Sequence, residues 1–342
     1  MYPLSRREAM QLLAASSLLI QDKPSKPVPT YVVRDGKIQF HCTAGYPERW
    51  QQVYQNTIDH FAGKWGRVGP TNIFLIENAD WDQKKRTEVE TRQLEQSQQE
   101  LKRVYCELQG HGLRSEHLDW QTGNHWTSWN NRPARIMITM TMSPFQDPMQ
   151  FVIGPIHEYN HALQTVHGYG QEAIDGNQMG HALWTGPAWW REGSSVLVAA
   201  LYSYQHPDLF DQLGKPYTWG RFSSEMNRNL ELFQQAQTPL RDGSTHDDWQ
   251  RLEKQNLVHP VVYAGGSVAC AMLLKRAGSL ENFMNFYPLV PQLGWQKAFE
   301  QHFQIGLDAF YKEFAAEAAA ARVQRRSEPA KDNWFGFLKT IP

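Results

Sequence analysis

Two histidines four residues apart, His157 and His161, form the His-Glu-x-x-His pattern that most constrains this chain. On a helix this spacing places both imidazole rings on one face, where they can bind one metal ion. Glu158 lies about 100° round the helix from His157, close enough to reach a water on that ion. Zinc binds neutral imidazole, and a catalytic zinc site uses three protein ligands and leaves a fourth position open. The pattern therefore predicts a metal-binding helix that still needs a third ligand.

The residues around this pattern favour a buried helix. Gly154 and Pro155 are typical of the turn that enters a helix and of its first turn. An apolar face opposite the histidines predicts that one side packs while the other carries chemistry. That face consists of Ile156, Tyr159, Ala162, Leu163 and Val166. The alternative is chance, because the protein has 13 histidines and two of them could share a helix without binding a metal.

A second stretch supplies a carboxylate. Its sequence, Trp189-Trp190-Arg191-Glu192-Gly193, is followed by two serines. It resembles the Trp-Leu-x-Glu-Gly-x-Ala signature of the gluzincins, a metallopeptidase group that includes thermolysin-like and aminopeptidase-N-like enzymes. The resemblance implies that Glu192 is the third zinc ligand. The small residues after it would let this helix pack closely against the metal-binding helix. The alternative is an exposed glutamate at the start of a hydrophobic helix.

His167 is a competing third ligand. It lies six residues after His161, the spacing of the metzincin pattern His-Glu-x-x-His-x-x-Gly-x-x-His. That pattern needs glycine where this chain has Gln164, because the chain must leave the helix sharply there. With glutamine the helix is expected to continue, which turns His167 away from the metal-binding face. His167 then fits a histidine at the end of the helix, before Gly168.

A third segment, Val261-Val262-Tyr263-Ala264-Gly265-Gly266, is similar to the Tyr-x-x-Gly helix start of aminopeptidase-N-like enzymes. The resemblance implies that the Tyr263 hydroxyl stabilises an oxyanion, and the alternative is a tyrosine of the core. Two features of the family are missing. Val196 stands where thermolysin-like enzymes have an acidic residue that orients a zinc histidine, so that partner must lie elsewhere. The Gly-Ala-Met-Glu-Asn motif that reads a free amino terminus is absent, so aminopeptidase activity is unsupported.

The resemblance implies an α+β fold, with a zincin-like N-terminal lobe that contains a mixed sheet and the zinc-binding helix, followed by an all-α lobe. It implies a peptidase that holds one Zn²⁺ ion with His157, His161 and Glu192. Glu158 would be the general base and Tyr263 the oxyanion donor, and the substrate would be a peptide or protein. The alternatives are an inactive zinc-bearing protein of the same fold, a metzincin-type peptidase that uses His167, and a glycan-binding module in which the histidines are incidental.

Length, charge and cysteine content limit what the sequence implies about domains, partners and disulfides. At 342 residues the chain is long enough for a large core and one or two domains. Its formal net charge of −1 implies neither nucleic acid nor an anionic membrane surface as a partner. The three cysteines, Cys42, Cys106 and Cys270, lack metal-like spacing and leave room for one disulfide at most.

Residues 1–26 resemble a signal for export. Ser5-Arg6-Arg7-Glu8 resembles a twin-arginine motif, and a largely apolar run from Ala9 to Ile20 follows it. Twelve residues are too few to span a bilayer but fit the apolar region of a signal peptide. The segment predicts a periplasmic or extracellular protein with no stable membrane span. The alternative is a short amphipathic helix.

The rest of the chain divides into an α/β lobe at 27–168, a helical lobe at 169–326 and an apolar tail at 327–342 that docks onto the body. In the first lobe we expect helices at 47–64 and 83–109, strands at 72–76 and 134–141, and a Trp- and His-rich loop at 110–133. The aromatic side chains of that loop either line a substrate cleft or pack the loop against the body of the protein. By resemblance, strand 134–141 is the sheet edge that would bind an extended substrate.

Overall fold

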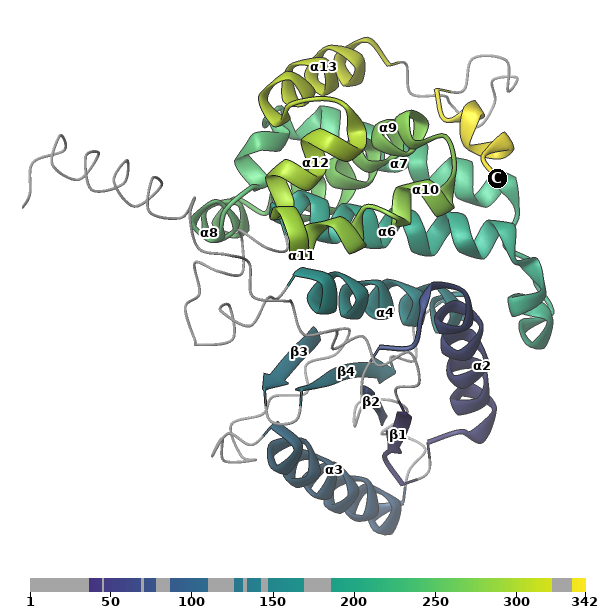
Figure 1. The fold of residues 1–342 in the computed structure, drawn as a ribbon. Helices are drawn as coiled ribbons and strands as arrows, with labels where there is room; N and C mark the ends of the chain where they lie inside the picture. Colours follow the sequence, from purple (N-terminus) through teal and green to yellow (C-terminus); the bar gives the residue numbers. More distant parts are fainter. Residues whose placement is uncertain are drawn as a thin grey trace, which may run out of the picture.

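The structure is a computed structural model of the full chain, drawn in Figure 1. It describes residues 37–44, 46–68, 71–77, 87–109, 126–131, 134–142, 147–168, 186–321 and 334–342. The export-like segment at 1–26 lies outside these residues, as does most of the Trp- and His-rich loop.

A four-stranded sheet forms the centre of the N-terminal part. Its strand order is β1 (Ile38–Cys42), β2 (Thr71–Glu77), β4 (Ala134–Met142) and β3 (Trp126–Asn131). β1, β2 and β4 run parallel, whereas β3 is antiparallel to β4. The sheet is therefore mixed, and the chain has the α+β character that its sequence predicts.

Helices cover both faces of the sheet. The helices α2 (Glu48–Trp65) and α4 (Gln150–Gly168) lie on one face, and α3 (Glu88–Gln109) lies on the other (Figure 1). Successive residues of a strand point to opposite faces, and both faces of β2 are apolar and buried. Ile73 and Leu75 join the core formed with α2 and α4, while Phe74 and Ile76 alternate with them and face α3.

From Gly186 onward the described chain is helical. Its α-helices are α6 (Ala188–Gln205), α7 (Trp219–Ala236), α8 (His246–Lys254), α9 (Gly266–Ala277), α10 (Leu280–Met284), α11 (Val290–Leu293), α12 (Trp295–Phe303) and α13 (Leu307–Ala320). The 3₁₀-helical segments are η3 (Pro207–Leu213), η4 (Leu240–Gly243), η6 (Tyr287–Leu289) and η8 (Gly336–Thr340), and η5 (His259–Gly265) is π-helical. In the described part of the chain, no helix combines the length and the apolar character needed to cross a bilayer.

One hydrophobic core joins the two parts. It contains side chains from α2 and α4, from α6 and α9, and from the C-terminal segment. Phe335 and Leu338 are fully buried in it, so the described part of the tail, residues 334–342, packs onto the body. Because α4 contacts both α2 and α6, this helix, which carries His157 and His161, lies between the sheet and the helical part (Figure 1).

The prediction of a loop at 110–133 is wrong for residues 126–131, which form β3. Trp126 pairs with Thr139 and Asn131 with Ala134, so β3 and β4 are neighbours along the chain and in the sheet. Tryptophan and threonine favour strands, but the polar residues between them hide the pattern. A second prediction is also wrong, because β4 lies between β2 and β3 and is not an edge. In the described sheet the edge on this side is β3.

The helix α4 begins earlier than expected, at Gln150, so that Pro155 lies inside it. The Asp147 carboxylate accepts a hydrogen bond from the backbone N–H of Met149, and Phe151 packs against α2 with its ring 4.2 Å from that of Trp50. A proline in a helix interior costs about 3 kcal/mol, and burial of the added apolar turn offsets that loss. Gly154, directly before Pro155, has no Cβ to clash with the proline ring.

The backbones of α6 and α9 approach each other closely, with glycines at the contact. A Cβ added at Gly193 would overlap the backbone of Gly266, and a Cβ added at Gly266 would overlap the carbonyl oxygen of Trp189. Gly193 therefore faces α9. The expectation that its small size serves packing against α4 is wrong for this residue. The two serines that follow it do face α4, where both contact Gln164.

We expect Gly193→Ala to lower the free energy of unfolding by about 2–3 kcal/mol, since backbone atoms must move to admit the methyl group. Gly63→Ala is the matched control, because Gly63 is an exposed residue inside α2 with no atom near the added methyl group. That change should stabilise the protein by roughly 0.5–1 kcal/mol. Urea unfolding of both variants measures the effect, and equal midpoints would contradict the close packing.

Candidate metal centre

Three side chains from two helices converge at one point. His157 and His161 project from α4, and Glu192 projects from the first turns of α6. Their ligand atoms all lie within 4.8 Å of one another. The two Nε2 atoms are 3.1 Å apart, and a Glu192 carboxylate oxygen lies 3.2 Å from His161 Nε2 and 3.7 Å from His157 Nε2. The structure thus brings together the three ligands that the sequence predicts, and this group could hold a metal ion.

The spacing fits a tetrahedral ion. Bonds of about 2.0–2.1 Å to nitrogen and oxygen place tetrahedral ligands roughly 3.3 Å apart. The three observed separations, 3.1, 3.2 and 3.7 Å, bracket that value. Among the described residues, two imidazole nitrogens and one carboxylate form the group, which leaves a fourth tetrahedral position without a ligand from this part of the chain, as in a catalytic site.

The charges at the centre favour a cation. Burial alone would lower the pKa of His161, but the adjacent Glu192 carboxylate outweighs it and raises that pKa to about 9. For Glu192, burial acts to raise the pKa, yet the two histidines hold it well below its ordinary value. The carboxylate therefore draws positive charge to the histidine nitrogens, whether as a proton or as a metal ion.

Glu158 lies beside the ligands without being one of them. Its carboxylate is 3% exposed, and Oε1 lies 4.0 Å from His157 Nε2. Among the described residues, Oε2 is a buried atom with no hydrogen-bond partner. A buried carboxylate oxygen that is left unpaired is unfavourable for stability, so its presence indicates a role other than packing.

Tyr263 approaches the centre from the helical side. It lies in the π-helical turn η5 that leads into α9, a small departure from the expected helix start. Burial raises the pKa of its hydroxyl, and so do the negative charges of Glu192 and Glu158 and a hydrogen bond to Glu192. The hydroxyl thus stays protonated and lies next to the metal ligands, where it can act as a donor.

His167 is not part of the group. The helix continues through Gln164 as predicted, and the His167 ring stacks on Tyr287 with ring centroids 6.5 Å apart. Burial lowers the pKa of His167 to about 4, so the ring is neutral at physiological pH. Its packing does not favour the metzincin arrangement.

The partner of His161 that the sequence left open at Val196 is Gln164. Its Oε1 lies 2.9 Å from His161 Nδ1, the ring nitrogen on the far side from the cluster. The only sequence signal for this contact is the three-residue spacing on one helix, which is too common to single out a glutamine.

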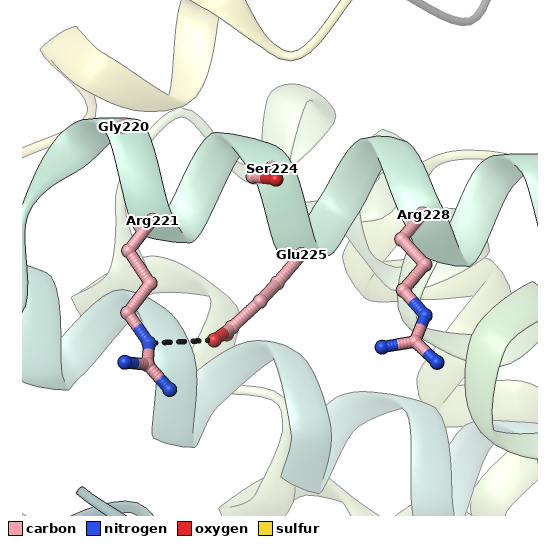
Figure 2. A pocket seen from close by; sticks show the side chains of 5 residues that line it. All are labelled: Gly220, Arg221, Ser224, Glu225 and Arg228. Carbon is pink, nitrogen blue, oxygen red and sulfur yellow. Dashed lines mark hydrogen bonds and ion pairs between the residues drawn. The ribbon is translucent and has the colours of Figure 1, made fainter. Parts of the chain in front are cut away.

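A separate cavity of about 560 Å³ lies along α7. The described residues that line it are Gly220, Arg221, Ser224, Glu225 and Arg228. Figure 2 shows Arg221 and Glu225 pointing toward one another, with the Arg228 side chain extending in the same direction from the next turn. Arg221 also pairs with Asp147 before α4. Arg221 is thus paired with two carboxylates, Glu225 in the cavity lining and Asp147 outside it.

No model of a known protein family matches this chain, and neither curated proteins nor solved structures give a match. The interpretation of the centre therefore rests on its residues and their geometry.

The low pKa of His167 predicts how stability depends on pH. The folded protein resists protonation of this ring until about pH 4, whereas the unfolded chain takes up the proton near pH 6.5. Stability should therefore fall as the pH drops from 6.5 to 4, by roughly 3 kcal/mol at most from this residue.

His167→Phe keeps an aromatic ring against Tyr287 and removes the titration. Measured by urea unfolding with a chelator present, the variant should gain stability relative to the wild type as the pH falls. A difference that stays constant between about pH 4.5 and 7 would contradict a buried neutral ring. The variant should also bind metal as the wild type does.

Proposed function

We propose that this protein is a zinc-dependent peptidase of the gluzincin type, with a zincin-like N-terminal lobe. The observation that carries the proposal is the approach of Glu192 to within 3.2 Å of His161 across two helices, beside the buried carboxylate of Glu158. A gluzincin needs this combination of two helical histidines, a glutamate from the next long helix and a general base.

A zinc ion held by His157, His161 and Glu192 would supply a Lewis acid for both the attacking water and the peptide carbonyl. Glu158 would take the proton of the water and deliver it to the leaving amine. Its unpaired Oε2 is the atom free to accept that proton. The Tyr263 hydroxyl would donate a hydrogen bond to the oxygen that becomes negative during the attack.

We place the substrate at the edge of the sheet next to α4. The edge strand β3 contacts α4, and α4 carries the two histidines. An edge strand offers backbone N–H and C=O groups to an extended peptide, which can add to the sheet as a further strand. We therefore assign to β3 the substrate-binding role that the sequence had given to strand 134–141.

An inactive zinc-bearing protein is the main alternative. Such a protein needs the three ligands but has no use for a general base. A buried glutamate with an unpaired oxygen lowers the stability of the fold, so a reaction is the reason we give for its presence. A neutral residue in place of Glu158 would leave the three ligands intact. The presence of Glu158 therefore favours catalysis.

The direct test compares Glu158→Gln with the wild type. Zinc content, measured by mass spectrometry, should stay at about one ion per chain, because Glu158 is not a ligand. Cleavage of a quenched fluorescent peptide library should fall at least roughly 100-fold, since the general base is lost.

Two further variants serve as controls. Glu192→Ala should lose both zinc and cleavage, while Glu253→Gln, an exposed site on α8, should change neither. A wild-type protein that binds zinc but cleaves no member of the library would favour the inactive binding protein. A wild type that binds no zinc would contradict the proposal.

Tyr263→Phe tests the oxyanion donor. Loss of one such donor lowers kcat by about 100-fold, and we expect KM and zinc content to stay the same. Tyr204→Phe is the control, because it removes a phenol hydroxyl from the other end of α6. If Tyr263→Phe instead lowers zinc content, the hydroxyl holds Glu192 in place and is not the oxyanion donor.

A further inference from the structure

The second ring nitrogen of His161 is held by a buried amide. Gln164 is only 4% exposed, and its Oε1 lies 2.9 Å from His161 Nδ1. The Ser195 hydroxyl also lies 3.3 Å from that nitrogen. In a metal site, the group bonded to the outer nitrogen of a histidine decides which nitrogen is left for the metal.

The orientation of the amide follows from its other contacts. The Gln164 Nε2 lies 2.9 Å from the carbonyl oxygen of Arg191 and 2.8 Å from the Ser194 hydroxyl. A carbonyl oxygen can only accept a hydrogen bond, so the NH₂ group must face Arg191 and the amide oxygen must face His161. That oxygen also only accepts, so Nδ1 of His161 carries a hydrogen. In the neutral ring the lone pair is then on Nε2, which faces the other two ligands.

The same amide holds the third ligand. Arg191 directly precedes Glu192, so the bond from Gln164 to the Arg191 carbonyl fixes the backbone next to the glutamate. Around it lies a buried polar network between α4, α6 and η6. Its members are Asn160, Gln164, Ser194, Ser195 and Tyr287.

We propose that Gln164 is the positioning residue of the metal centre. It sets the tautomer of His161 and ties that ligand to the helix that carries Glu192. This inference rests on the proposed zinc site and deepens it. In thermolysin-like enzymes an acidic residue at the position of Val196 orients a zinc histidine. Here Gln164 orients His161, with a neutral amide oxygen in place of a carboxylate.

The test is zinc affinity, measured on the full chain by competition with a chromogenic chelator. Gln164→Met has nearly the same volume and lacks both polar contacts, and it should weaken zinc binding by about 10–100-fold. Gln164→Glu keeps an acceptor facing Nδ1, but its second oxygen lies against the Arg191 carbonyl oxygen, which cannot donate to it. It should therefore bind zinc more weakly than the wild type and more tightly than Gln164→Met.

Ser203→Ala is the matched control for packing. It removes a buried hydroxyl from the other end of α6, away from Gln164 and the three ligands, so zinc affinity should stay within about threefold of wild type. If Ser203→Ala and Gln164→Met weaken binding equally, or Gln164→Glu binds as weakly as Gln164→Met, the positioning role is overturned.

The cobalt-loaded protein gives a second readout that is independent of turnover. Its visible absorption should shift in Gln164→Glu, because a carboxylate makes His161 a stronger ligand, and stay unchanged in Ser203→Ala. If Gln164→Met does not fold, the spectra of Gln164→Glu and of the control variant still test the positioning role of Gln164. Wild-type zinc binding with unaltered affinity in Gln164→Met would overturn this inference alone, whereas a wild type that binds no zinc would overturn the proposed function with it.

Discussion

The position of α6 between α4 and α9 is the constraint on which the rest of the structure depends. On one side Gly193 and Gly266 bring two backbones into contact, and a side chain on either glycine would force them apart. On the other side Ser194 and Ser195 meet the buried polar residues of α4. Metal ligands tolerate deviations of only about 0.2 Å in bond length. The place of Glu192 in the first turns of α6 is useful for a metal only because both contacts fix this helix.

The centre gathers negative charge in a buried region, which is unfavourable for the protein without a cation. Glu192 and Glu158 are both mostly buried, and one oxygen of Glu158 has no partner among the described residues. In the metal-free chain a proton on His161 compensates in part, which is why the pKa of that ring rises to about 9. A divalent ion would supply twice that charge at the same place. Packing around the centre thus holds an arrangement of charges that a bound cation would stabilise.

The sequence was informative where function and local geometry coincide. The spacing of His157 and His161 predicts a shared helical face without any knowledge of the fold, and a resemblance to gluzincins adds Glu192. The start of α4 was misjudged because Pro155 is a strong local signal, whereas the burial of Phe151 that overrides it is a tertiary effect. The strand β3 was missed for the same reason, since its pairing with β4 gives it a regularity that its polar residues do not show.

Gln164 shows the limit of reading a site from its motif. Nothing local distinguishes this glutamine from one on a solvated helix face, and its role depends on the Arg191 carbonyl of another helix. The choice of an amide also fits the charge of the centre. Glu158 and Glu192 can carry two negative charges, which one divalent cation neutralises. A third carboxylate against His161 would leave a net negative charge in a buried site, and desolvation makes that unfavourable. A neutral acceptor orients the histidine without adding to that charge.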